Sequence, residues 1–326
     1  MRRPLSPIAA FTCAVALAVT GCSKGAGSTP DSAAHSPGYA PYVSATEAAA
    51  TDSAGSPGTY NLAFVISGGS GCTPKWNGTE AVTDSAVTSR TSALKKNGAT
   101  VRVSFGGASG KELAATCDNA EELAGAYAEA LDAAGSTAAD FDIEGDELTD
   151  SPSVALRSRA IARLQEERPD LDVSFTLPVM PSGLDADGLA LLESANTYDV
   201  QVSTVNLMTM NYGESYGGDM GDYALTSAKA THAQLKTVFG LSDARAWRGM
   251  ALTSMIGVND VAGETFTLAD AGQVRAFAEQ KGIAWVSMWS AFRDRQCGGA
   301  SAAEDALTVC SGVKQEKGAF GEAFAG

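Results

Sequence analysis

The chain alternates short apolar runs with longer amphipathic segments along most of its 326 residues. Eight runs have the length and composition of strands, at 39–43, 60–67, 100–105, 139–143, 172–178, 204–210, 248–253 and 284–288. Helical spacing of apolar residues fills the gaps, at 84–97, 121–134, 153–168, 187–195, 223–239 and 268–281. Eight strands alternating with helices over about 290 residues predict an α/β fold, a single-domain (β/α)8 TIM barrel.

A doubly wound open sheet is the structural alternative for this alternation. Such sheets place a glycine-rich phosphate loop after an early strand, and no loop of that kind follows the first runs here. We therefore prefer the barrel. In a barrel, the functional groups gather where the strands end, at the C-terminal face.

The fourth run carries three acidic residues at alternate positions, Asp140, Asp142 and Glu144. Alternate side chains of a strand point to the same face, so these three carboxyl groups would crowd together. Like charges at such spacing resist ionising together, and at least one proton is retained near neutral pH. Glu144, at the C-terminal end of the run, is then placed as a general acid. The solvated face of an edge strand and a Mg²⁺ or Ca²⁺ site are alternatives that the pattern alone leaves open.

Composition excludes several other chemistries. The chain has only two histidines, His35 and His232, and no GxSxG motif. A zinc hydrolase would want two or three histidine ligands, so we expect no metal and no cofactor. The formal charge of −15 argues against nucleic acid or an anionic membrane surface as a partner, and it is compatible with a neutral polysaccharide.

The N-terminus has the pattern of an export signal. Two arginines precede a short apolar stretch, 8–19, which is too short to span a bilayer as a permanent helix. The following Val-Thr-Gly-Cys resembles a bacterial lipobox, in which Cys22 becomes the lipidated first residue. We expect residues 1–21 to be a signal peptide, 22–37 a flexible tether and 38–326 the catalytic domain. The predicted location is the cell surface, with the lipid anchor as the only membrane contact; plain secretion is the alternative.

The other four cysteines are Cys72, Cys117, Cys297 and Cys310, an even number in a chain expected to be exported. Disulfides are the default interpretation of such cysteines, and no CxxC spacing suggests a metal. Of the three pairings, we favour Cys72–Cys117 and Cys297–Cys310. In the predicted barrel the first two follow neighbouring strands, and the last two both follow the eighth strand.

Four segments together resemble the family 18 glycoside hydrolases, the chitinase family. The fourth strand of that family reads Asp-Gly-x-Asp-x-Asp-x-Glu, and residues 137–144 match its last three acids but not the leading Asp-Gly. Residues 104–107 match the Ser-x-Gly-Gly of the third strand. Residues 208–212 fall where the sixth strand usually reads Met-x-Tyr-Asp, and Trp289 closes the eighth strand, where the family places a Trp under the sugar. The resemblance covers about residues 38–296.

The resemblance implies retaining hydrolysis of β-1,4-linked N-acetylglucosamine, in chitin or chitooligosaccharides, with help from the substrate's own acetamido group. Glu144 would protonate the glycosidic oxygen and later accept a proton from water. Asp142 would hold the acetamido N–H. Asp140 would lie deeper and share a proton with Asp142.

The chain departs from the family at the sixth strand. Met210 stands where an aromatic hydroxyl is usual, and Asn211 stands where an Asp is usual. We expect Tyr212 to supply the hydroxyl from a shifted position and Asn211 to donate a hydrogen bond, with one titrating neighbour of Glu144 lost. The expected substrate contacts are Trp289 as a stacking floor, Trp76 at the rim, and Ser104, Gly106, Gly107, Met208 and Met210.

Two other functions share these motifs. An endo-β-N-acetylglucosaminidase acting on glycan cores would carry the same acidic strand. A chitin-binding protein without turnover is the second alternative, suggested by the residues at 210 and 211. In each case the expected partner is a polysaccharide or glycan, and we expect a monomer.

Overall fold

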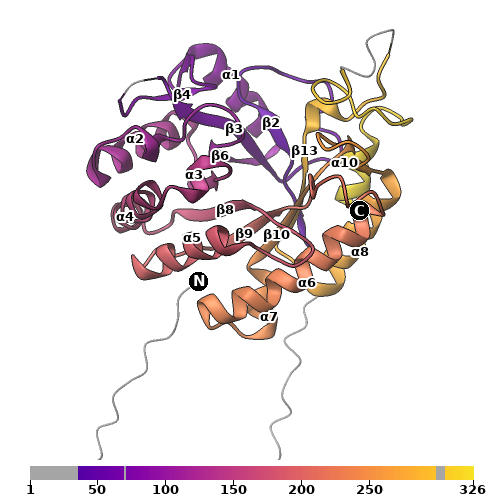
Figure 1. Ribbon diagram of the computed structural model, residues 1–326. Coiled ribbons are helices and arrows are strands. Elements are labelled where there is room, and N and C mark those ends of the chain that lie inside the picture. The colour runs from indigo at the N-terminus through magenta and orange to yellow at the C-terminus, as the bar shows by residue number, and fades with distance from the viewer. Residues whose placement is uncertain (1–35, 70, 299–304) are drawn as a thin grey trace, which may run out of the picture.

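The computed structural model describes residues 36–69, 71–298 and 305–326 (Figure 1). The predicted signal peptide, Cys22 and nearly all of the predicted tether lie outside the described residues. The first strand begins at Gly38.

The strands form a closed parallel barrel, as the sequence predicted. They are β1 (Gly38–Tyr39) with β2 (Tyr42–Ser44), β3 (Thr59–Ser67), β6 (Thr100–Gly106), β7 (Ala138–Asp142), β8 (Asp172–Pro178), β9 (Thr204–Met208), β10 (Met250–Met255) and β13 (Trp285–Trp289). Neighbours from β3 through β13 pair in parallel in sequence order. The first predicted strand is interrupted around Pro41, which has no N–H to donate. Its first half, β1, pairs with β13 and its second half, β2, pairs with β3, so the two halves close the ring.

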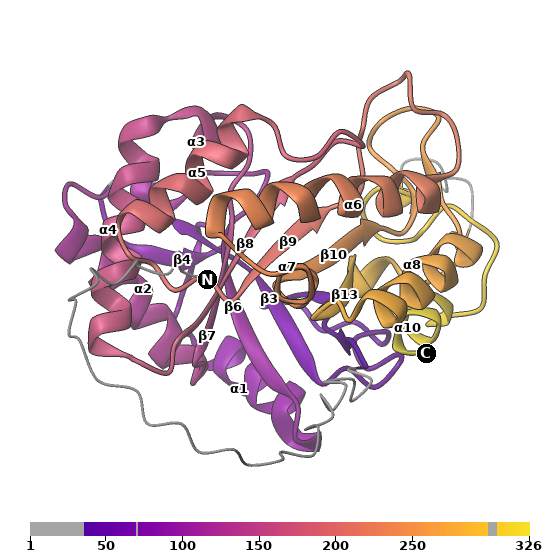
Figure 2. The ribbon, with the colours of Figure 1, turned by 90° about the horizontal axis from the view of Figure 1, so that it is seen from below.

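Helices surround the strands on the outside, as the view from below shows (Figure 2). The six predicted helices are present as α1 (Ser85–Leu94), α2 (Ala120–Ala134), α4 (Ser151–Glu167), α5 (Ala186–Thr197), α6 (Met220–Phe239) and α8 (Leu268–Lys281). Side chains cap several of their N-termini; Asp84 and Asn119 accept backbone N–H bonds, and Thr267 and Asp270 form a capping box.

Sequence periodicity missed the shorter elements. These are β4 (Pro74–Trp76), β5 (Glu80–Ala81), α3 (Asp146–Thr149), α7 (Asp243–Arg248), β11 (Gly257–Val258), β12 (Thr265–Phe266), α10 (Ala319–Ala325) and the 3-10 turns η1 (Lys95–Asn97), η2 (Leu113–Ala115) and η3 (Ala291–Arg293). Most lie in loops after strands, where no long apolar period marks them.

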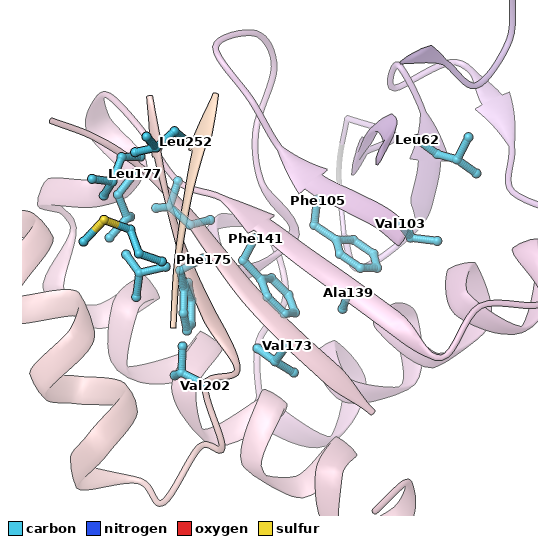
Figure 3. Close-up of a cluster of buried hydrophobic side chains, with 14 of the residues drawn as sticks. Leu62, Val103, Phe105, Ala139, Phe141, Val173, Phe175, Leu177, Val202 and Leu252 are labelled. Carbon is cyan, nitrogen blue, oxygen red and sulfur yellow. The ribbon is translucent and has the colours of Figure 1, made fainter. Parts of the chain in front are cut away.

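A row of aromatic rings lies between the strands and the helices (Figure 3). Phe105, Phe141 and Phe175 occupy β6, β7 and β8, with ring centroids 5.3 Å and 5.7 Å apart, and each is almost fully buried. Because side chains alternate along a strand, this outward row turns Asp140 and Asp142 to the inside of the barrel. The packing of the phenylalanines thus places the acids.

Both predicted disulfides are present. Cys72–Cys117 joins the loop after β3 to the loop after β6, and Cys297–Cys310 joins two points beyond β13. At the opposite end of the barrel, Arg275 of α8 donates to the Pro37 carbonyl at 3.1 Å and holds the chain just before β1. In the part of the chain that the structure covers, no helix has the length and apolar character needed to cross a membrane.

Candidate active site

A cavity of about 120 Å³ opens at the C-terminal face of the barrel, at the end of β7. Its lining includes Asp142, Glu144, Met208, Met210, Asn211 and Trp289. The structure therefore brings together residues from the fourth, sixth and eighth strands, as the resemblance implied.

Asp140 lies deepest and is fully buried. Its carboxylate accepts four hydrogen bonds, from Tyr42 Oη at 2.8 Å, Ser104 Oγ at 2.7 Å, Ser174 Oγ at 2.8 Å and Thr176 Oγ1 at 2.7 Å. A carboxylate has about four acceptor positions, so hydroxyl groups occupy all of them. The sharing of a proton between Asp140 and Asp142 stays a prediction. The charge of Asp140 raises the pKa of Asp142.

Asp142 and Glu144 form a coupled pair of carboxyl groups. The pKa of Asp142 is raised well above its usual range, first by burial, then by the charges of Glu144 and Asp140, and also by a hydrogen bond with Glu144. Burial also raises the pKa of Glu144, partly offset by the bond from Asp142. Both shifts favour the protonated form of the pair, which is the direction that the spacing predicted. Oδ1 of Asp142 is buried without a hydrogen-bond partner among the described residues.

Asp260 is the site residue that sequence reasoning missed. It lies in the hairpin between β11 and β12, lines the same cavity, and its charge raises the pKa of Glu144. Asn211 Nδ2 donates to Asp260 Oδ2 at 3.1 Å, and the Asp260 N–H donates to Asn211 Oδ1 at 3.1 Å. The negative charge that we expected Glu144 to lack at position 211 is supplied from position 260. No motif surrounds Asp260, and only the fold brings it to the cavity.

Tyr212 does not supply the missing hydroxyl, and that expectation was wrong. Asn211 has φ +55°, and Tyr212, which follows it, does not line the cavity. The Tyr212 ring is buried against Tyr216 and Tyr223, and its Oη lies 3.4 Å from Ser227 Oγ on α6. Asn211 itself does reach the cavity.

Trp289 lies where a sugar floor was expected. It ends β13, borders the cavity and remains partly exposed. Its ring stacks on Phe64 at 5.5 Å between centroids and meets the edge of Tyr42 at 5.9 Å. Trp76, in contrast, is only 1% exposed, so its predicted place at the rim was wrong. It belongs to β4, which pairs antiparallel with the end of β3 and buries the ring in the core.

The Ser-Phe-Gly-Gly segment, at the end of β6, packs against the acidic strand β7. Ser104 is fully buried and donates to Asp140, so its expected contact with substrate is also wrong. Gly106 has φ +100°, and a Cβ there would lie 2.1 Å from the carbonyl oxygen of Asp142. The Gly107 N–H donates to that same carbonyl at 2.9 Å. Gly106 therefore lets the loop after β6 close directly against the acidic strand, whereas a Cβ at Gly107 would lie 2.8 Å from the Phe64 ring.

The cavity continues into wider hollows on either side of Glu144. Glu144 borders hollows of about 440 Å³ and 210 Å³, the smaller of which also contains Met208 and Met210. Trp289 and Phe64 border a third, of about 520 Å³. Each of the three hollows shares lining residues with the catalytic cavity, Glu144 in two of them and Phe64 with Trp289 in the third.

Comparison with known proteins supports a single family. No protein-family model matches the chain. The chain is 36% identical over 275 residues to a probable bifunctional chitinase/lysozyme of Escherichia coli and 35% identical over 275 residues to endochitinase 11 of Metarhizium anisopliae. Each match covers 78% of this chain, but only 31% and 52% of the respective relatives. The chain thus spans about a third of the length of the first relative and about half of the length of the second.

Solved structures extend the likeness to the whole barrel. The catalytic domain of a hyperthermophilic chitinase from Pyrococcus furiosus matches with a TM-score of 0.77 and 29% identity, covering 89% of this chain and 94% of that domain. A GH18 chitinase from Pseudoalteromonas aurantia has the same fold, with a TM-score of 0.57, 14% identity and coverage of 78% and 93%. With the acidic strand, the glycine pair and the terminal Trp in their places, the chain belongs to the family 18 glycoside hydrolases, the chitinase family.

Proposed function

We propose that the protein hydrolyses β-1,4-linked N-acetylglucosamine in chitin or chitooligosaccharides, with retention of configuration. The observation that carries this proposal is the hydrogen-bonded pair Asp142–Glu144 beside the partly exposed ring of Trp289. The names of the relatives, a chitinase/lysozyme and an endochitinase, support the same substrate class.

The geometry suits catalysis assisted by the substrate. A sugar lying on Trp289 would direct its acetamido N–H to the unpartnered Oδ1 of Asp142. Glu144 gives its proton to the glycosidic oxygen as the acetamido oxygen attacks C1 and the C1–O bond breaks. Asp140 and Asp142 stabilise the positive charge that develops on the oxazolinium ring. Glu144, now ionised, takes a proton from water, which opens the ring at C1 from the face that the leaving group occupied.

Substitution of the acid tests this function. Glu144→Gln keeps the shape of the side chain and removes its proton, so turnover of a chitin oligomer should fall by about 10²–10⁴-fold while oligomer binding is kept. Glu166→Gln, on the exposed face of α4, is the matched control and should behave as wild type. A Glu144→Gln variant that keeps more than about a tenth of wild-type turnover contradicts the assigned role.

The same assay separates the alternatives. A wild-type protein that binds the oligomer and yields no shorter products is a binding protein without turnover. Cleavage of an N-glycan core in preference to chitin oligomers identifies the endo-β-N-acetylglucosaminidase. Initial products in the α configuration, seen by NMR, would exclude the retaining mechanism.

We also propose that the protein is exported and anchored through lipid on Cys22, and that it acts as a monomer. The two disulfides support an oxidising compartment. Cys22→Ala should move the protein from the membrane fraction to the medium without loss of activity. Retention of the variant in the membrane fraction would contradict the anchor.

A further inference from the structure

A buried carboxylate near the active site has no part in the chemistry described above. Glu264 lies just before β12, is only 1% exposed and does not line the catalytic cavity. Its Oε1 accepts the backbone N–H of Gly213 at 2.8 Å, across 51 positions in the sequence. Burial raises the pKa of Glu264, and hydrogen bonds from the backbone N–H groups of Gly213, Asn211 and Tyr212 offset part of that rise. Three successive N–H groups therefore converge on one carboxylate.

These three N–H groups belong to the loop that carries Asn211 into the cavity. Asn211 has φ +55°, a region that residues other than glycine seldom adopt. Such a conformation persists where the surrounding structure fixes it. Successive backbone N–H groups in a turn form a concave site for an anion, and Glu264 supplies the anion here. Glu264 thus fixes the loop at the point where Asn211 enters the cavity.

Glu264 also shapes the turn that carries Asp260. Its N–H donates to the Val261 carbonyl at 3.2 Å, and its carbonyl accepts the Asn259 N–H at 3.1 Å. These two bonds close the turn between β11 and β12, with Asp260 inside it. One residue therefore joins the loop after β9 to the turn that holds the missing charge of the site.

The pair formed by Asn211 and Asp260 depends on this support. Asp260 is exposed, and the two hydrogen bonds between the residues are each 3.1 Å long. Hydrogen bonds that water can replace add little stability by themselves. The distance from the charge of Asp260 to Glu144 is therefore set by the backbone on either side of the pair, and Glu264 holds both backbones.

Asp260 is the route by which the hairpin acts on Glu144. Burial raises the pKa of Glu144, the bond with Asp142 lowers it, and the charge of Asp260 raises it. The other charged groups around these residues are Asp140 below Asp142, Lys111, Asp146, Glu147 and Asp150 in one adjoining hollow, Asp185 in the other, and Arg293 beside Asp260.

We propose that Glu264 is a positioning residue, which holds Asn211 and Asp260 against the catalytic cavity and so keeps the charge of Asp260 beside Glu144. The proposal rests on the proposed function and adds to it a residue that acts without touching the substrate. Loss of the Glu264 carboxylate should free Asp260 to move away, so Glu144 should ionise at lower pH. The basic limb of kcat/KM against pH should then move to lower pH, by no more than it moves in Asp260→Asn.

A fluorogenic substrate measures the effect. The probe is the 4-methylumbelliferyl β-glycoside of three N-acetylglucosamine units, with release of methylumbelliferone followed across the pH range. Glu264→Ala should show the shifted basic limb. Glu264→Gln keeps an oxygen that can accept the Gly213 N–H, so its basic limb should lie closer to that of the wild type. Glu214→Gln, which removes an exposed charge from the same loop, is the matched control and should leave the limb in place.

A double variant separates positioning from loss of stability. If Glu264 acts through Asp260, adding Glu264→Ala to Asp260→Asn should move the basic limb no further. A residue that only stabilises the fold would lower the melting temperature, and lower turnover by one factor at every pH, without moving the limb. If Glu264→Ala does not fold, Glu264→Asp takes its place, because its carboxylate is one methylene too short to reach the Gly213 N–H.

An unmoved basic limb in the single variant, or a full further shift in the double variant, overturns the proposal. A shift to lower pH that is absent from the double variant supports it. If the wild-type protein releases no fluorophore at any pH, the proposed hydrolytic function has failed. The positioning role is then tested by NMR titration of ¹³C-labelled glutamate carboxyl groups, and an equal pKa of Glu144 in the wild type and in Glu264→Ala overturns it.

Discussion

Replacement of Gly106 by alanine should disturb the acidic strand without touching any acid. The added Cβ would lie 2.1 Å from the carbonyl oxygen of Asp142 and 3.5 Å from the side chain of Glu112. The first contact is with backbone, which cannot rotate away, so β6 and β7 have to separate. In addition, φ at this position is +100°, a region that L-residues rarely adopt.

The size of the effect follows from these two terms. Backbone strain of this kind costs about 1–3 kcal/mol, and forcing an extra carbon into a packed interior costs about 1–3 kcal/mol more. We expect Gly106→Ala to lower the free energy of unfolding by about 2–6 kcal/mol, measured by urea denaturation. Turnover should fall as well, because a displacement of about 1 Å at a catalytic group costs about 10²-fold in rate.

Gly125→Ala is the matched control. Gly125 lies on the exposed side of α2, and nothing approaches within 4 Å of its added Cβ. Alanine in a helix interior is more stable than glycine by about 1 kcal/mol, so this variant should be stabilised and fully active. Wild-type stability and turnover in Gly106→Ala would refute the reasoning. Lower stability with unchanged turnover would refute the link between the glycine contact and the acids.

Two further substitutions test charges that the structure places. Asp260→Asn removes a negative charge that raises the pKa of Glu144, so Glu144 should ionise at lower pH. In a plot of kcat/KM against pH, the basic limb should therefore move to lower pH. A basic limb that does not move would exclude the electrostatic role of Asp260. Arg157→Met leaves the buried carboxylate of Glu112 without its partner at 2.8 Å, which should cost about 3–5 kcal/mol of unfolding free energy. Arg168→Met breaks the ion pair of Arg168 with Asp132 at the surface and should cost about 0–1 kcal/mol of unfolding free energy, measured by urea denaturation. Equal losses in the two variants would contradict the argument that burial makes the Arg157–Glu112 pair costly to break.

Alternation along strands explains what the sequence could predict. The inward position of Asp140 and Asp142 follows from the apolar residues between them, and the barrel follows from eight such runs separated by helices. Every predicted strand is present within a few residues, although the first is divided in two. The disulfide pairing follows from the same topology, because it depends on which strand precedes each cysteine.

The site residues that were predicted wrongly or not at all lie where the inward and outward alternation of the long strands has ended. Tyr212 follows Asn211, which lies beyond the end of β9 and has a positive φ, so the alternation of the strand no longer applies there. Trp76 belongs to a three-residue strand that turns back on β3, too short to leave a pattern. Asp260 comes from a hairpin with two-residue strands, and its hydrogen bonds to Asn211 span 49 positions in the sequence. Contacts of that kind depend on tertiary packing and leave no local signal.

The way in which the chain enters the barrel has a consequence for its orientation at a cell surface. The strands run parallel, so Gly38 at the start of β1 lies at the end opposite the cleft, and Arg275 holds Ser36 and Pro37 there. A lipid on Cys22, as proposed above, would pull on that lower end, because the described chain enters the barrel there. The cleft would then face away from the bilayer, toward polymer arriving from outside.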